Sequence, residues 1–117
     1  MDRDSFDTLV ATVLDDLPDW VRDAFDNISV LVEDAPGAKL GPGTDGLLGL
    51  YTGIPLPERD SSYAGALPDV IYIFRQPHLA LELPEAELRQ EIAKTVLHEV
   101  AHYFGLDDAY LEEQGWG

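Results

Sequence analysis

Two histidines and a glutamate near the end of the chain have the spacing of a metal-binding hydrolytic site. His98, Glu99 and His102 form the pattern His-Glu-x-x-His. On a helix, residues four apart lie about 40° apart around the axis, so both imidazoles can reach one ion. Glu99 lies beside the pair, which suits a base that acts on a metal-bound water. Chance gives roughly 0.004 such patterns in a shuffled chain of this composition, so the pattern predicts metal-assisted hydrolysis.

The residues that follow extend this pattern to a third metal ligand. Gly105 and Asp108 complete the sequence His-Glu-x-x-His-x-x-Gly-x-x-Asp. Glycine accepts the left-handed conformation of a sharp turn after a helix, and the Asp108 carboxylate could then close a zinc site that keeps a fourth position for water. The chain has no cysteine, so any metal must use histidine and carboxylate. Asp108 could instead cap a short final helix. Other candidate third ligands are Asp107, Glu112 and Glu113.

The motif falls on a helix that we expect to begin at Pro84 and to stop at Gly105. Apolar side chains recur along it at four-residue intervals, namely those of Leu88, Ile92, Val96, Val100 and Phe104. They fill the arc opposite the two histidines, while Glu91 and Thr95 share the histidine side. The helix is therefore expected to bury one face and to present the other to a cleft.

The rest of the chain predicts two short helices and then three strands. Helical spacing covers residues 5–17, with Ser5 as the N-cap, and Pro18 opens a second helix with Trp20 and Phe25 as core candidates. Short apolar runs predict strands at residues 28–33, 47–52 and 70–74, and a last short helix is expected at roughly 108–113. This order indicates an α+β fold, and the length indicates one domain over residues 1–117.

The chain is strongly acidic. Its 23 acidic and 7 basic residues give a formal charge of −16. Such a surface repels phosphate backbones and anionic lipid, so we expect neither nucleic acid nor a membrane as partner. No apolar stretch is long enough to cross a bilayer, and Met1 to Asp4 is acidic where a signal peptide is basic. We therefore expect a soluble, cytoplasmic protein whose oligomeric state is open and compatible with a monomer.

The sequence resembles the small bacterial zincin-like metallopeptidases that carry the extended HExxHxxGxxD motif. The likeness reaches beyond the motif to residues 17–19, 27–33, 47–56, 67–77 and 91–108. It implies a minimal zincin fold, in which a small mixed sheet packs against N-terminal helices and the long motif helix. It also implies Zn²⁺ held by His98, His102 and Asp108, with Glu99 activating a zinc-bound water to hydrolyse a peptide or protein substrate. The methionine turn of metzincins has no counterpart, because the only methionine is Met1.

Several residues outside the motif have two readings. His78 is expected to be an exposed loop histidine rather than a functional one. Tyr103 and Tyr110 are expected to be packing residues, although either could assist an oxyanion. For Arg75, a surface charge and a functional role are equally expected. The strand at residues 70–74 is a candidate edge along which an extended peptide could pair.

Two other functions compete with a peptidase. The first is a zinc-binding interaction or regulatory module with little or no activity, whose acidic face binds a basic protein. Glu99 counts against it, because a structural zinc site prefers four protein ligands and needs no base. The second is a zinc-dependent endoribonuclease. With only 7 basic residues among 117, the chain lacks the basic surface that such an enzyme needs to bind phosphate groups.

Overall fold

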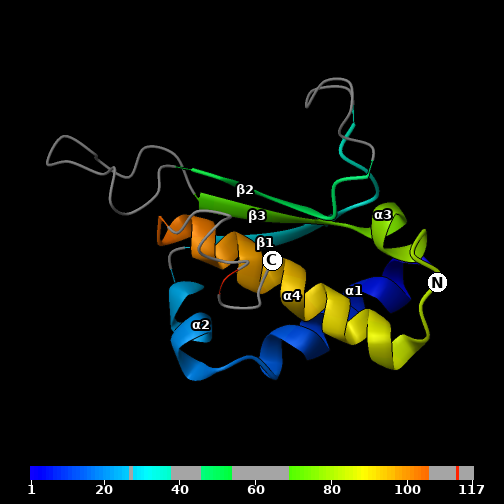
Figure 1. The fold of residues 1–117 in the computed structure, drawn as a ribbon, viewed down its shortest axis with the longest axis horizontal. Coiled ribbons are helices and arrows are strands. Elements are labelled where there is room, and N and C mark those ends of the chain that lie inside the picture. The colour runs from blue at the N-terminus through cyan, green and yellow to red at the C-terminus, as the bar shows by residue number, and fades with distance from the viewer. Residues whose placement is uncertain (27, 38–45, 54–68, 106–112, 114–117) are drawn as a thin grey trace, which may run out of the picture.

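Helices open and close the described part of the chain, and strands lie between them (Figure 1). The computed structural model describes residues 1–26, 28–37, 46–53, 69–105 and 113. In chain order the elements are α1 (Arg3–Asp15), α2 (Asp19–Ala24), β1 (Ile28–Glu33), β2 (Gly49–Thr52), β3 (Asp69–Phe74), α3 (Arg75–Leu79) and α4 (Glu85–Tyr103). This confirms the α+β class. The short helix expected at 108–113 lies outside the described residues, apart from Glu113.

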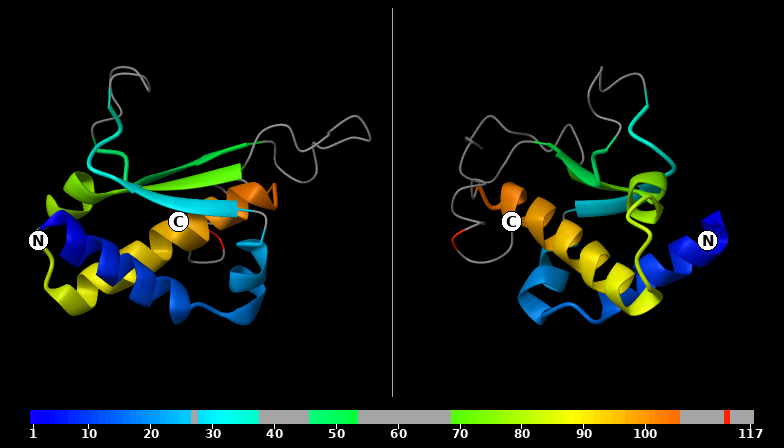
Figure 2. Two further views of the ribbon diagram at one scale, coloured as in Figure 1. Left: turned by 180° about the vertical axis from the view of Figure 1, so that it is seen from behind. Right: turned by 45° about the vertical axis from the view of Figure 1, so that its right-hand side comes forward.

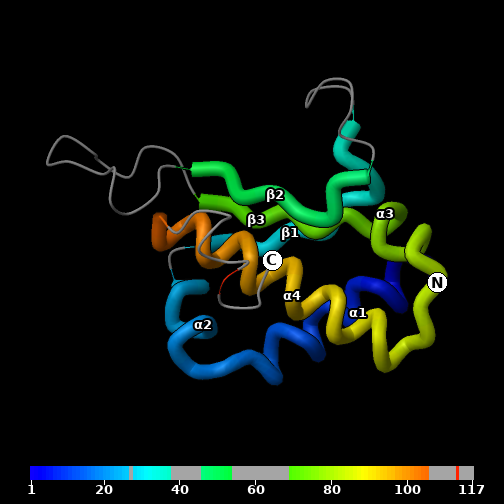
Figure 3. The backbone as a smooth tube through the Cα atoms, in the orientation of Figure 1, coloured from blue at the N-terminus to red at the C-terminus, as the bar shows by residue number. Residues whose placement is uncertain are grey.

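The three strands form one mixed sheet in the order β1-β3-β2. β1 pairs with β3 in parallel, and β2 pairs with β3 antiparallel. β3 is therefore the central strand, and its expected role as the peptide-binding edge is wrong. Ile71 and Ile73 on the helix face of β3 are buried, whereas Val70 and Tyr72 on the opposite face are half-buried. Figure 3 shows β2 along one side of β3, with α4 crossing beneath both strands.

The helices begin and end at local signals, some of which lie at other residues than predicted. α1 starts before Ser5, because the Asp2 carboxylate is the N-cap and accepts a hydrogen bond from Ser5 N at 2.8 Å. This hydrogen bond lowers the pKa of Asp2. Trp20 is 47% exposed, so its assignment to the core is wrong, whereas Phe25 packs against the core as expected. Helix α3 was not expected and follows β3 directly.

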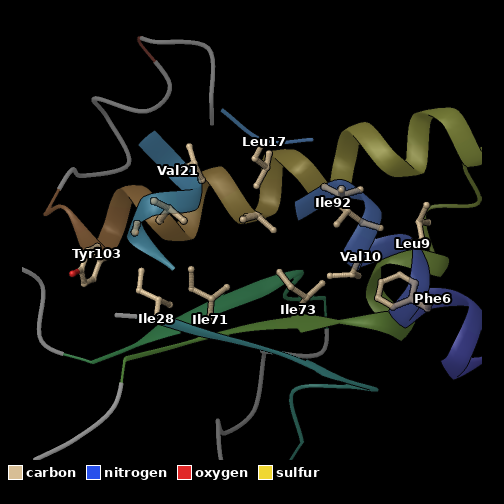
Figure 4. Packing of buried hydrophobic residues seen from close by; sticks show 14 of the residues in the cluster. Phe6, Leu9, Val10, Leu17, Val21, Ile28, Ile71, Ile73, Ile92 and Tyr103 are labelled. Carbon is tan, nitrogen blue, oxygen red and sulfur yellow. The ribbon is translucent and has the colours of Figure 1, made fainter. Parts of the chain in front are cut away.

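α1, α2 and α4 cover one face of the sheet, and the core lies between them (Figure 2). Strand residues alternate across the sheet, so Ile71 and Ile73 point toward the helices and are fully buried, whereas Leu31 is 45% exposed. On α4, Ile92, Val96 and Val100 are fully buried, which confirms the predicted apolar arc. Figure 4 shows Ile71 and Ile73 of the sheet pointing toward the helices, on the side of the sheet where Ile92 of α4 lies. The motif helix is thereby fixed under the sheet.

Candidate functional site

One turn of α4 brings the three motif side chains together. The rings of His98 and His102 lie edge to face with their centroids 4.6 Å apart. Each of His98, Glu99 and His102 offers a ligand atom, and these atoms all lie within 4.8 Å of one another. Both histidines are half-buried, while Glu99 is only 6% exposed. The predicted geometry of two imidazoles on one helix face is therefore present.

Glu99 is held beneath the edge strand β2. Its Oε1 accepts a hydrogen bond from the main-chain N–H of Tyr51 at 2.8 Å. The same oxygen lies 3.3 Å from His102 Nδ1. A buried carboxylate needs such donors, because it has lost the water that would otherwise solvate it. Tyr51 was not predicted as a site residue, because a main-chain donor leaves no mark in the residue type.

The end of α4 has the turn that the motif predicts. Gly105 has a φ of 81°, in the left-handed region that favours glycine, and its N–H donates to the carbonyl of His102 at 2.9 Å. The role of Gly105 is thus confirmed. Tyr103 is 3% exposed and belongs to the core cluster, as expected for a packing residue. The chain beyond this turn carries the remaining candidates Asp107, Asp108, Tyr110 and Glu112, all of which lie outside the described residues.

His78 is not the exposed loop residue that the sequence suggested. It lies in α3 and is fully buried, with Nδ1 2.7 Å from the carbonyl of Phe74 and Nε2 3.0 Å from Thr95 Oγ1. Burial lowers the pKa of His78, although the hydrogen bond to Phe74 and the charge of Glu91 oppose this shift. Thr95 belongs to the histidine side of α4, so His78 contacts the motif helix on that side. The sequence already placed His78 just after a buried strand, but its burial depends on helix α3, which was not predicted.

Arg75 ties the start of α3 to the N-terminal part of the molecule. Its Nε lies 2.9 Å from the Asp34 carboxylate, and its Nη1 donates to the carbonyl of Met1 at 2.9 Å. The pKa of Asp34 is lowered, chiefly by the hydrogen bond from Arg75. Arg75 therefore serves as a structural contact, which agrees with the non-catalytic reading of this residue.

The donor set fits a zinc ion. Neutral imidazole nitrogens and carboxylate oxygens are ligands that zinc accepts, and the residues on α4 supply both types close together. A helix that carries two histidines one turn apart leaves the remaining ligand positions to other groups. By the distances between the donor atoms alone, Glu99 could be either a ligand of the ion or a neighbour of it. Its hydrogen bond to Tyr51 draws the carboxylate toward β2.

The fold and this cluster define an α+β protein with a candidate metal-binding group on a helix under a mixed sheet. The family model for zincin-like metallopeptidases matches residues 25–116. The chain therefore belongs to the zincin-like metallopeptidase family, in which a metal, typically zinc, is implied. A comparison with curated proteins finds no match. Within the part of the chain that the structure describes, no helix is both long and apolar enough to cross a membrane.

Proposed function

We propose that the protein is a zinc-dependent peptidase in which His98, His102 and Asp108 hold the metal and Glu99 is the catalytic base. The position of Glu99 carries the proposal. Its carboxylate is buried beside the two histidines and is held by a main-chain donor rather than solvated at the surface. Membership of the zincin-like family supports the metal and the class of reaction. A structural zinc site would have no use for such a base.

The chemistry divides between the ion and the protein. Zinc, when bound, polarises a carbonyl and lowers the pKa of a water toward about 7. Glu99 takes the proton of the attacking water and later delivers it to the leaving amine. His98 and His102 bind as neutral imidazoles, and Asp108 adds a negative charge that a third histidine would not supply.

The substrate that we propose is an extended peptide lying along β2. Among the described residues, β2 pairs with β3 alone, and a peptide added along its outer side would use main-chain groups other than the Tyr51 N–H, which donates to Glu99. Tyr51 lies on this strand and contacts Glu99, which supports a scissile bond close to the motif. This replaces β3 as the strand for peptide pairing. The formal charge of −16 supports a peptide rather than a nucleic acid.

A peptide library digestion tests this proposal. Zinc-loaded protein is incubated with peptides derived from a whole proteome, and new termini are identified by mass spectrometry beside a chelated sample. We expect new termini in the zinc-loaded sample only, and their flanking residues would give the cleavage specificity. No new termini from a protein shown to contain zinc would contradict a peptidase and favour the zinc-binding interaction module.

A further inference from the structure

The main-chain N–H of Tyr51 points away from β3 and toward Glu99 on α4. Phe74 N donates to the carbonyl of Leu48 at 2.9 Å, which sets the phase of the antiparallel ladder. In such a ladder, residue pairs that exchange hydrogen bonds alternate with pairs that do not. Tyr51 is paired with Ile71, which falls in the second class. Its N–H is therefore not used within the sheet and donates to Glu99 Oε1 at 2.8 Å.

Gly49 allows β2 to come this close to the helix. A Cβ at residue 49 would lie 2.6 Å from Thr95 Cγ2, 3.0 Å from the carbonyl oxygen of Tyr72 and 3.5 Å from Glu99 Cγ. The first distance is shorter than real Cβ contacts, so any larger residue must move the strand or the helix. Both contacted side chains are buried on α4. The glycine thus faces the same turn of the helix that carries Glu99.

A ring contact holds the same strand to the same helix. The Tyr51 ring meets the ring of Tyr103 edge to face, with centroids 6.1 Å apart and an angle of 77° between planes. Tyr103 is a buried core residue in the last turn of α4. The ring contact and the N–H bond fix Tyr51 to α4 at two points. Glu99 therefore meets a donor whose position is set by packing.

We propose that β2 positions the catalytic base: the Tyr51 N–H holds Oε1 of Glu99, and Gly49 is the residue that permits this approach. The inference rests on the proposed function, since it takes Glu99 as the base. A donor held by the fold restricts the rotamers of Glu99 before substrate binds. Less side-chain conformational entropy is therefore lost on reaching the transition state. With Oε1 held by β2, proton transfer is assigned to Oε2. Tyr51 and Gly49 are positioning residues that act through Glu99.

The test measures the hydrogen bond directly by NMR in the full-length protein, zinc-loaded and metal-free. The observable is the scalar coupling across the hydrogen bond between the ¹⁵N of Tyr51 and the carboxylate ¹³C of Glu99. The variant is Gly49→Ala, and the matched control is Gly46→Ala, where a Cβ would meet nothing within 4 Å. We expect the coupling in the parent and in Gly46→Ala, and its loss in Gly49→Ala. Absence of the coupling in the parent would overturn the proposal.

A second variant separates positioning from folding. Thr95→Ser removes Cγ2, the atom that the new Cβ would strike, and keeps the hydroxyl that contacts His78. In the double variant Gly49→Ala/Thr95→Ser, we expect the coupling to return at least in part. A double variant with a native spectrum and no coupling would refute the role of Gly49. Where Gly49→Ala alone does not fold, the double variant is compared with Thr95→Ser.

Kinetics on a peptide cleaved by the parent complete the test. We expect Gly49→Ala to lower kcat by roughly 10²-fold with little change in KM, as misplacement of a catalytic group does. An unchanged kcat in a variant that has lost the coupling would overturn the positioning role. A parent that shows the coupling and cleaves no peptide would refute the proposed function and leave the contact between β2 and Glu99 standing. The two failures are therefore distinguishable.

Discussion

His78 Nε2 lies 3.0 Å from the hydroxyl of Thr95, which joins a buried histidine to the motif helix. The Thr95 hydroxyl is also 3.0 Å from the carbonyl of Glu91, and its single proton cannot serve both acceptors. With the Nδ1 proton of His78 donated to Phe74, a neutral imidazole must accept the Thr95 proton at Nε2. A charged imidazole would instead donate to Thr95, whose proton would turn to Glu91. The charge of His78 thus sets the direction of this hydrogen bond.

His78 is expected to make stability fall in mild acid. Its pKa in the folded protein lies below the ordinary value of 6.5, because burial disfavours the charged ring. As the pH falls through 6.5, the unfolded chain takes up a proton that the folded chain does not, so the free energy of unfolding decreases. The stability that neutral His78 contributes is fully present above pH 6.5 and is lost as the pH falls through its pKa in the folded protein. Urea unfolding of metal-free protein at pH 7.5 and pH 5.0 measures it.

The control for this experiment is His78→Gln, whose amide does not titrate. We expect the parent to lose more stability between the two pH values than the variant does. The other ionisable groups of the chain are the same in both proteins, so the difference between parent and variant isolates His78. Asp2 and Asp34, whose pKa values are lowered from 3.8, act only at more acidic pH. Equal losses in parent and variant would contradict a neutral, buried His78.

The two faces of the sheet are expected to respond differently to truncation. Ile71 is fully buried against the helices, so Ile71→Ala should cost about 2–5 kcal/mol of unfolding free energy. Leu31 is 45% exposed, and Leu31→Ala should stay within about 0.5 kcal/mol of the parent. Denaturant unfolding of the two variants measures both values. Similar losses at the two positions would contradict the one-sided packing of the sheet.

Regular patterns along the sequence predicted the elements that carry the site. The four-residue apolar period indicated α4, and the run of β-branched residues indicated β1 over residues 28–33 as observed. Gly105 marked the turn after the helix, because its left-handed conformation is a local requirement. These features depend on residues that are close together in the chain, so they can be predicted from the sequence alone.

Features that depend on distant contacts were not predicted. The donor of Tyr51 is a main-chain group, and its partner Glu99 is 48 residues away. The burial of His78 follows from α3, a five-residue helix containing Pro77 that has no apolar period of its own. Trp20 fits the apolar side of a short helix in sequence, yet the core does not extend to it. Strand order places β3 at the centre, and only the tertiary pairing decides this.

Removal of the metal is expected to leave the fold intact. The core cluster contains neither His98 nor His102, so the packing of α4 under the sheet does not need the ion. A ligand at 100 times its Kd adds about 2.7 kcal/mol to stability, so zinc should raise Tm without being required for folding. Circular dichroism of the chelated protein measures this. Unfolding on chelation would favour the alternative of a structural zinc module.

Asp108 is expected to contribute the third metal ligand. Changes outside the ligand set already weaken metal binding about 10–100-fold, so Asp108→Ala should raise the Kd for zinc by at least roughly 10²-fold. Competition with a chromophoric chelator measures the Kd. Asp107→Ala is the matched control, because it removes the adjacent carboxylate and should change the Kd little. A large effect at Asp107 and none at Asp108 would move the ligand to Asp107.

The most direct test of the account is the dependence of peptide cleavage on the Glu99 carboxylate. Glu99→Gln is compared with Glu87→Gln, which makes the same change of charge in the exposed first turn of α4. Both proteins are loaded with zinc, checked for metal content, and incubated with the proteome-derived peptide library. We predict that Glu99→Gln retains zinc and loses cleavage, while Glu87→Gln cleaves like the parent. Zinc-loaded Glu99→Gln with the activity of the parent would contradict Glu99 as the base.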